Sequence, residues 1–389
     1  MVGHLKAPEQ RRRDDIVPPG IVAIADYEAL ARASLPGDIF AYLAGGAGDE
    51  ITLRENENAF RAIRLRPRVL RDMTGAHRRL SLFGVACDSP LILAPAAYQT
   101  LFHPDGERET ALAASAMQTI MTVSTQSGVA LEDIARDATA PFWFQLYVQP
   151  DRAATEALVR RAENSGYTAL VVTVDAQVSG MRNREQRAGF ALPPGIAAAN
   201  LRDRPRADAA SGGESGQLLL GGPLLQAAPT WRDIVWLKSL TRLPLLIKGV
   251  MTPEDALLAL EAGIDGIVVS NHGGRALDTL PPTIAVLPGI AAAIDGRVPV
   301  LLDGGIRRGS DIVKAIALGA NAVMIGRPYL YGLAAAGAVG VAHVIRILLA
   351  ELEVTMALTG CRTLDEIGRA AIWTAPMDAA AYGSSSVSQ

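Results

Sequence analysis

One histidine of this chain stands in a setting that suits acid–base chemistry. His272 follows the apolar run 266–269 and lies within the segment 270–275, which reads Ser-Asn-His-Gly-Gly-Arg. Imidazole is the side chain that most readily gives and takes protons near neutral pH. Asp175, which follows the apolar run 169–172, could pair with the imidazolium of His272, although a carboxylate there could also simply cap its loop. The pattern predicts an acid–base site at His272.

Cationic and glycine residues follow other apolar runs. Lys248 ends the run 245–247, where a cation could be a Schiff-base nucleophile, the counter-ion of a ligand anion or half of a structural ion pair. Glycine lets the backbone approach an anion and arginine offers a two-pronged donor. Two later runs are followed by residues of these kinds, namely Asp303, Gly304, Gly305 and Arg307 after one, and Gly326 and Arg327 after the other. We therefore expect a phosphorylated ligand.

The elements that must position these residues are alternating strands and helices. Short runs rich in Val, Ile and Leu recur from residue 91 onward, separated by segments of helical periodicity. The runs are 91–94, 120–123, 142–146, 169–172, 245–247, 266–269, 298–302 and 322–325. Eight parallel strands that alternate with helices predict an α/β fold of the (β/α)8 TIM-barrel class, whose chemistry lies at the carboxyl ends of the strands. The residues singled out above all follow strands.

The helices between these runs carry their own signals. Segments 151–165, 253–262 and 310–318 have helical periodicity, and each is followed closely by a glycine suited to a positive φ. Ser310 is the expected N-cap of the last of them. Two further helices, 25–34 and 37–43, are expected to pack on or plug one end of the barrel.

The chain divides into a barrel domain and two tails. We expect a flexible tail over 1–20, a barrel domain over 21–376 and a second flexible tail over 377–389. The connection between the fourth and fifth strands is much longer than the others, and its part from about 193 to 229 is rich in Ala, Gly, Pro, Arg and Asp. A long connection at such a place is often a functional lid, so we expect a mobile lid there.

The composition excludes several classes of protein. Lys and Arg number 37 against 40 Asp and Glu in 389 residues, so no strong positive field favours nucleic acid. The two cysteines, Cys87 and Cys361, form no disulfide framework and suit a reducing compartment, so we expect a cytoplasmic protein. With one strand-end histidine and no Cys/His cluster, no metal site is expected. We also expect no membrane span, because no run approaches the roughly 18 uncharged apolar residues that a membrane-spanning helix needs.

Several of these segments together resemble one enzyme family. The segment 270–275 with Leu277-Asp278, Lys248-Gly249, the run Asp-Gly-Gly-Ile-Arg at 303–307 and Gly-Arg-Pro at 326–328 are similar to the FMN-dependent α-hydroxy-acid oxidases and dehydrogenases. That family includes glycolate oxidase, lactate oxidase and mandelate-oxidising enzymes. The resemblance runs from about residue 27 to about residue 361, and the Ser-Asn-His-Gly-Gly-Arg element is highly specific.

The resemblance implies FMN as cofactor and gives each residue a role. Lys248 would stabilise the reduced flavin at its N1/O2 edge, as a counter-ion. Asp303 would hold the ribityl hydroxyls. The residues implied to bind FMN are Pro95, Ala96, Ala97, Ser124, Gln145, Thr173, Lys248, Ser270, Asp303, Gly304, Gly305, Arg307, Gly326 and Arg327.

The resemblance also implies the substrate site. His272, poised by Asp175, would be the base, and Lys248 and Tyr147 would share in catalysis. The carboxylate of a 2-hydroxy acid would be bound by Tyr42, Tyr147, Arg182, His272 and Arg275. Ala188 stands where the family usually has Asn, which puts in doubt how the root of the lid is anchored.

These residues favour oxidation of an (S)-2-hydroxy acid to the 2-oxo acid. Dioxygen is the favoured acceptor, because Ala97 stands where dehydrogenases of the family often carry Gly. Tyr42, Tyr98 and Tyr147 favour a mandelate-like substrate over lactate. The family further implies a homo-oligomer, a tetramer or an octamer. Two other hypotheses stay open. The protein could be a Schiff-base lyase that acts through Lys248 on a phosphorylated substrate, or a relic that binds flavin without catalysing a reaction.

Overall fold

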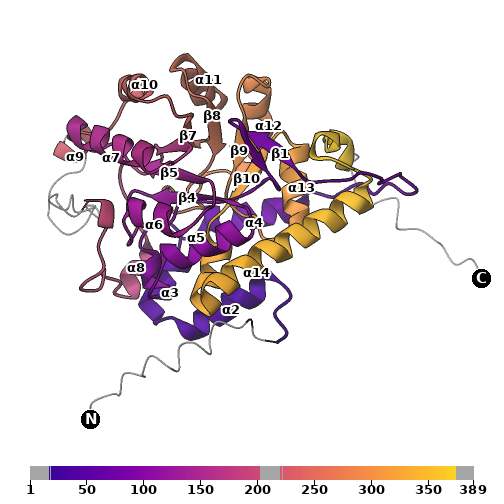
Figure 1. The fold of residues 1–389 in the computed structure, drawn as a ribbon, viewed down its shortest axis with the longest axis horizontal. Coiled ribbons are helices and arrows are strands. Elements are labelled where there is room, and N and C mark those ends of the chain that lie inside the picture. The colour runs from indigo at the N-terminus through magenta and orange to yellow at the C-terminus, as the bar shows by residue number, and fades with distance from the viewer. Residues whose placement is uncertain (1–16, 18, 202–219, 221, 374–389) are drawn as a thin grey trace, which may run out of the picture.

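Eight parallel strands close into a barrel in this chain. The computed structural model describes residues 17, 19–201, 220 and 222–373. Neighbouring strands pair in the cyclic order β10-β3-β4-β5-β6-β7-β8-β9, and helices surround them (Figure 1). The strands are β3 (Leu91–Leu93), β4 (Ile120–Ser124), β5 (Phe142–Leu146), β6 (Ala169–Thr173), β7 (Leu245–Val250), β8 (Gly266–Val269), β9 (Val300–Leu302) and β10 (Ala322–Ile325). The (β/α)8 prediction is confirmed, and every predicted run is a strand.

Five of the eight strands differ from the predicted runs at one end: β3, β4 and β6 by a single residue, and β7 and β9 by more. β9 begins at Val300 and not at 298, because Pro299 has no N–H to donate to the neighbouring strand. β7 continues to Val250, since the pairing with β8 shifts register between Lys248 and Val250. This irregularity lies beside the lysine at which the chemistry is expected.

Helices follow each barrel strand and precede the first. Those before the barrel are α2 (Ile24–Ser34), α3 (Gly37–Ala44) and α4 (Ile51–Ala62). The later ones are α5 (Glu107–Ala116), α6 (Leu131–Asp137), α7 (Arg152–Asn164), α8 (Asn183–Arg187), α9 (Pro223–Gln226), α10 (Trp231–Leu240), α11 (Pro253–Glu261), α12 (Thr283–Ile294), α13 (Gly309–Ala317) and α14 (Arg327–Thr359). Short 3-10 helices are η1 (Gln99–Leu101), η2 (Ala199–Leu201), η3 (Leu364–Glu366) and η4 (Arg369–Ala371).

The expected helix ends are confirmed in part. Gly166, Gly263 and Gly319 all have positive φ after α7, α11 and α13, as their position predicted. Ser310 is not the N-cap of α13, because that helix begins one residue earlier, at Gly309. The carboxylate of Asp311 satisfies the start of the helix by accepting hydrogen bonds from the backbone N–H groups of residues 307 and 308, at 3.1 and 3.0 Å.

A short hairpin that the sequence did not reveal plugs the amino end of the barrel. β1 (Leu80–Leu82) and β2 (Val85–Cys87) pair in antiparallel fashion. Phe83 in their turn meets Trp143 edge-on with ring centroids 5.7 Å apart, and packs with the side chains of the barrel interior. The N-terminal helices therefore do not plug this end. Instead α2 packs against α14, and α3 contributes Tyr42 to the opposite end of the barrel.

The long helix α14 corrects the expectation that no run approaches the length of a membrane span. Residues 328–345 contain no charged side chain, and by length and composition α14 could cross a membrane. Most of these residues are buried inside the protein, where α14 packs against α2, α5 and α13. Its backbone is also interrupted by non-helical angles at Ala336 and Gly337. In the described chain it is a kinked core helix.

The long connection after β6 is described in part. Residues 202–219 and 221 of the expected lid, and the two expected tails over 1–16, 18 and 377–389, lie outside the described residues. The described part of the connection between β6 and β7 holds α8, η2, α9 and α10.

Candidate active site

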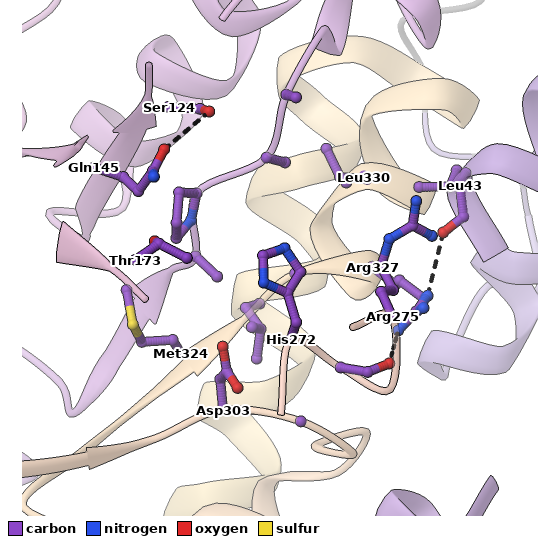
Figure 2. A pocket seen from close by; sticks show the side chains of 18 of the residues that line it. Leu43, Ser124, Gln145, Thr173, His272, Arg275, Asp303, Met324, Arg327 and Leu330 are labelled. Carbon is purple, nitrogen blue, oxygen red and sulfur yellow. Dashed lines mark hydrogen bonds between the residues drawn. The ribbon is translucent and has the colours of Figure 1, made fainter. Parts of the chain in front are cut away.

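One cavity lies at the carboxyl ends of the barrel strands. It encloses about 1130 Å³ of space free of protein atoms, its open mouth included. Every strand but β8 reaches it with its own residues or with those that follow directly, and the loop after β8 supplies His272 and Arg275 (Figure 2). It is lined by Tyr42, Pro95, Ala96, Ala97, Ser124, Gln145, Tyr147, Thr173, Arg182, Lys248, His272, Arg275, Asp303, Gly304, Gly305, Arg307, Gly326 and Arg327, all of them predicted, and by others. Asp175 and Ser270 lie behind this lining.

His272 and Asp175 form a pair at the cavity wall. Nδ1 of His272 lies 2.8 Å from Oδ1 of Asp175, which leaves Nε2 free to take a proton from a ligand. His272 has a positive φ of 57°, a conformation uncommon outside glycine and often found at active sites. Burial alone would raise the pKa of Asp175, but His272 and Lys248 outweigh it and hold that pKa below its ordinary value. The carboxylate is therefore charged and ready to stabilise an imidazolium.

Lys248 is a buried ammonium with two partners. Nζ donates to Ser270 Oγ at 2.8 Å and lies 3.0 Å from Asp303 Oδ2. Burial opposes the charge, but Asp303 and then Asp175 outweigh it and raise the pKa of Lys248. Ser270 also accepts a hydrogen bond from the backbone N–H of His272 at 3.1 Å. Ser270 thus positions two functional residues, whereas the resemblance implied a direct role in binding FMN.

Three buried polar atoms on residues expected to bind FMN have no hydrogen-bond partner in the part of the chain that the structure describes. They are Nε2 of Gln145, Oγ1 of Thr173 and Oδ1 of Asp303. The carboxamide of Gln145 is held in place by its other end, whose Oε1 accepts from Ser124 Oγ at 3.2 Å. Buried polar atoms without partners are costly, so these point to a polar ligand that the site is built to hold. A flavin ring with its ribityl chain offers such donors and acceptors, and the residues present fit FMN.

The expected phosphate end of the cavity is formed by glycines and arginines. Gly304 and Gly305 have φ of 89° and 85°, and a Cβ on Gly305 would lie 2.1 Å from the backbone oxygen of Asn56. Gly326 is the N-cap of α14 and has nothing within 4 Å of a would-be Cβ, so the helix start is open to a ligand. Arg307 pairs with Glu57 at 2.9 Å. An anion here would meet backbone N–H groups and a helix start.

Two arginines define the expected substrate end. Arg275 donates through Nη1 to the backbone oxygens of Tyr42 and Gly45, at 2.8 and 2.7 Å, and through Nη2 to Glu185 at 2.8 Å. Three of its five N–H donors are thus used, and two are left for a ligand. Arg182 shares Glu185, whose Oε2 lies 3.2 Å from its Nη1, and no described residue accepts a hydrogen bond from its buried Nε. The pair can bind a carboxylate.

Aromatic rings close the same end. Tyr42 stacks on Phe190 with centroids 4.5 Å apart and on Phe102 at 6.4 Å, and Phe102 lines the cavity. Burial, with smaller contributions from Asp175 and Tyr42, raises the pKa of Tyr147, so its phenol remains an O–H donor. Tyr98 was expected to border the substrate, but it does not line the cavity. The aromatic side chain of that loop in the cavity is that of Phe102.

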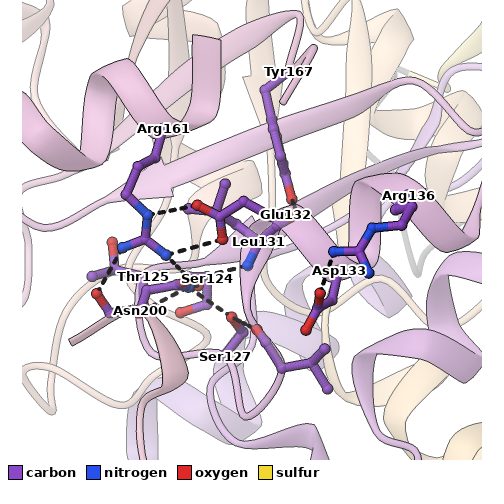
Figure 3. A network of polar contacts seen from close by, with 11 residues as sticks. Ser124, Thr125, Ser127, Leu131, Glu132, Asp133, Arg136, Arg161, Tyr167 and Asn200 are labelled. Carbon is purple, nitrogen blue, oxygen red and sulfur yellow. Dashed lines mark hydrogen bonds and ion pairs between the residues drawn. The ribbon is translucent and has the colours of Figure 1, made fainter. Parts of the chain in front are cut away.

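The connection after β6 is fastened to the barrel by a buried asparagine. Asn200 in η2 donates to Ser127 Oγ at 2.9 Å and accepts from the backbone N–H of Leu131 at 3.0 Å (Figure 3). Arg161 donates to the backbone oxygen of Asn200 at 3.1 Å and forms a two-pronged pair with Glu132. The root of the connection is therefore anchored beside the end of β4, by a residue other than Ala188.

Sequence reasoning missed Phe102, Glu185 and Asn56. Asn56 on α4 exchanges two 2.9 Å hydrogen bonds with Asn271, which fixes the loop that carries His272. The alternating polarity of α4 and the position of Glu185 three residues after Arg182 were the available signals. Neither signal says which face meets the cavity.

Comparisons with known proteins agree with this geometry. The model of the family described as FMN-dependent dehydrogenase matches residues 31–374. The chain is 48% identical to an L-lactate oxidase of Nostoc sp., over 89% of this chain and 96% of that protein. It is 44% identical to glycolate oxidase 1 of Oryza sativa subsp. indica, over 91% and 96%. A solved structure of mandelate oxidase with benzoyl-formic acid has a TM-score of 0.82 and 42% identity, over 90% of this chain and 98% of that one.

Proposed function

Because the chain belongs to the FMN-dependent dehydrogenase family, we propose that it oxidises an (S)-2-hydroxy acid to the 2-oxo acid and passes the electrons to dioxygen. The observation that carries the proposal is the loop after β8. It presents a base, His272 on Asp175, and a carboxylate-binding cation, Arg275, to one cavity. That cavity also holds the unpartnered polar atoms that fit FMN.

The residues of the chain divide the reaction between them. Arg275 and Arg182 orient the substrate by its carboxylate, which fixes the α-carbon and its hydroxyl relative to the cavity. Nε2 of His272 takes a proton from the substrate, and Asp175 stabilises the imidazolium that results. Tyr147 donates its phenol O–H toward the substrate oxygens. Bound FMN supplies the acceptor for the two electrons.

The state of Lys248 argues against the lyase reading. A Schiff-base nucleophile must be a neutral amine, whereas Asp303 and Asp175 raise the pKa of Lys248 and keep it protonated. A fixed ammonium suits a counter-ion at an electron-accepting ring. The relic reading is also disfavoured, because each residue expected to act on the substrate is present and lines or supports the cavity.

For the substrate we propose an acid with an aromatic side chain. The support is the stacked group Tyr42, Phe102 and Phe190 at the carboxylate end, and the resemblance to mandelate oxidase structures. Anaerobic reduction of the flavin by mandelate, lactate and glycolate, compared as the ratio of rate constant to Kd, tests this choice. A preference for mandelate supports the proposal, and a clear preference for glycolate refutes the aromatic assignment.

Dioxygen as acceptor has its own support and test. Ala97 lines the cavity beside the expected flavin ring, and the relatives named above are oxidases. Oxygen uptake with stoichiometric hydrogen peroxide and 2-oxo acid, at rates that match anaerobic flavin reduction, is the expected result. Turnover that needs an added dye or quinone would show a dehydrogenase instead.

We further propose a cytoplasmic location and a homo-oligomer of four or eight chains. Exposed apolar residues support assembly, since Val69 and Leu70 are 82% and 102% exposed and Leu358, on the neighbouring helix α14, is 64% exposed. Light scattering after size exclusion would show a mass of four or eight chains, and a monomer would refute this part of the proposal.

A further inference from the structure

A buried carboxylate lies between the two arginines of the substrate end. Glu185 on α8 has a side chain that is 11% exposed, and its oxygens lie 2.8 Å from Arg275 and 3.2 Å from Arg182. Both of its oxygens are thus engaged, and both partners line the cavity where the substrate carboxylate is expected. Glu185 itself does not line the cavity. It faces the arginines from behind.

The formal charges at this end nearly balance. The guanidinium groups of Arg182 and Arg275 and one carboxylate leave a single positive charge, which one substrate carboxylate would neutralise. The guanidinium of Arg327 donates to the same Gly45 oxygen as Arg275, but it belongs to the expected phosphate end, where the phosphate would offset its charge. Arg182 and Arg275 share one carboxylate, and burial together with the repulsion between the two cations lowers the pKa of Arg275. Glu185 offsets that repulsion and keeps both guanidinium groups in position.

We propose that Glu185 is a positioning and specificity residue. It holds Arg182 and Arg275 together and sets the charge of the substrate end so that acids with one carboxylate are preferred to acids with two. The inference rests on the proposed function, because it takes Arg182 and Arg275 as the receptors of the substrate carboxylate.

The other charged groups near the cavity are the same in wild type and in a variant of Glu185, so they do not change the comparison. Lys248 is paired with Asp303, and Asp175 faces His272. Next to Glu185 on α8, Arg184 is paired with Glu50 on the approach to α4. All of these remain the same when Glu185 alone is changed.

The test measures ligand binding and so does not depend on turnover. Oxalate and oxamate have nearly the same shape, but oxalate carries a second carboxylate where oxamate has an amide. Their Kd values are obtained from the change in visible absorbance of FMN-loaded protein. In Glu185→Gln, the ratio of the oxamate Kd to the oxalate Kd should rise on the order of tenfold over wild type, because an added unit of positive charge acts on the second negative charge.

A matched control variant distinguishes the effect of removing the charge of Glu185 from the effect of removing any buried carboxylate. Glu50→Gln removes a carboxylate that is 12% exposed and paired with Arg184, and Gln can still accept from the backbone N–H of Gly46. This variant should leave the ratio within about twofold of wild type, since its cation does not line the cavity. Glu185→Asp keeps the charge and should restore most of the discrimination.

Wild-type protein supplies a second measurement that needs no variant. Its kcat/KM for 2-hydroxy acids with one carboxylate should exceed that for (S)-malate at least tenfold. An unchanged ratio in Glu185→Gln, an equal change in Glu50→Gln, or efficient malate oxidation would overturn the inference. If neither ligand binds and no 2-hydroxy acid reduces the flavin, the proposed function has failed instead.

Discussion

Replacing Asp175 by Asn tests whether its charge supports proton transfer to His272. Asn has the same shape, so it can keep a hydrogen bond to Nδ1 but cannot stabilise an imidazolium by charge. Two unit charges about 4 Å apart interact by roughly 4 kcal/mol at an effective dielectric constant of about 20. His272 is 27% exposed, and the remaining hydrogen bond recovers part of this energy, so we expect a loss of roughly 2–4 kcal/mol in the transition state.

That loss corresponds to a fall of about 30-fold to about 1,000-fold in the rate constant of anaerobic flavin reduction. Stopped-flow absorbance measures the rate, and FMN affinity and oxamate binding serve as internal controls that should change little. His272→Ala alone should retain FMN and lose reduction by several orders of magnitude. If the two residues act as one unit, adding Asp175→Asn to His272→Ala should cost little more. A single variant within tenfold of wild type, or full additivity in the double variant, would refute the reasoning.

Three further predictions concern neighbouring residues. Arg275→Lys keeps the charge but cannot replace the three hydrogen bonds made by the guanidinium. The transition-state stabilisation calculated from kcat/KM should therefore fall by a few kcal/mol. An unchanged kcat/KM would show that the substrate carboxylate binds elsewhere. Gly249→Ala should slow flavin reduction, because a Cβ there would lie 2.6 Å from Cβ of Asp175. Gly166 also has a positive φ but has open space around a would-be Cβ, so Gly166→Ala should lower stability only, as melting curves would show. The raised pKa of Lys248 means that its charge contributes to stability at all pH values below the ordinary lysine range and is lost only as pH rises through the raised value. FMN affinity, measured by fluorescence, should therefore stay level from about pH 6 to about pH 9, and a lysine-dependent decline within that range would contradict this assignment.

The barrel and the cavity lining were predictable because both depend on local order along the chain. Each barrel strand is a short and mainly apolar run, and in a parallel barrel every run brings its next residues to the same end. That is why Thr173, Lys248 and Asp303, far apart in sequence, lie on one cavity as expected. The positive φ of Gly166 followed from its place after a helix in the same way.

Features that depend on long-range packing could not be read from sequence. The hairpin of β1 and β2 has only three residues in each strand, too few for a clear alternation of polarity. Tyr98 and Phe102 belong to one loop, and only the fold decides which ring reaches the cavity. Glu185 follows Arg182 by one helical turn, a spacing that also describes an ordinary surface pair, and its contact with Arg275 comes from a loop 90 residues away.

The visible absorbance of the purified protein, recorded before and after addition of (S)-mandelate without oxygen, tests the central claim most directly. The account predicts a yellow protein whose flavin bands are bleached by the acid and restored by air, with one benzoylformate formed per flavin reduced. A colourless protein that binds no added FMN, or a flavin that no (S)-2-hydroxy acid can reduce, would contradict it.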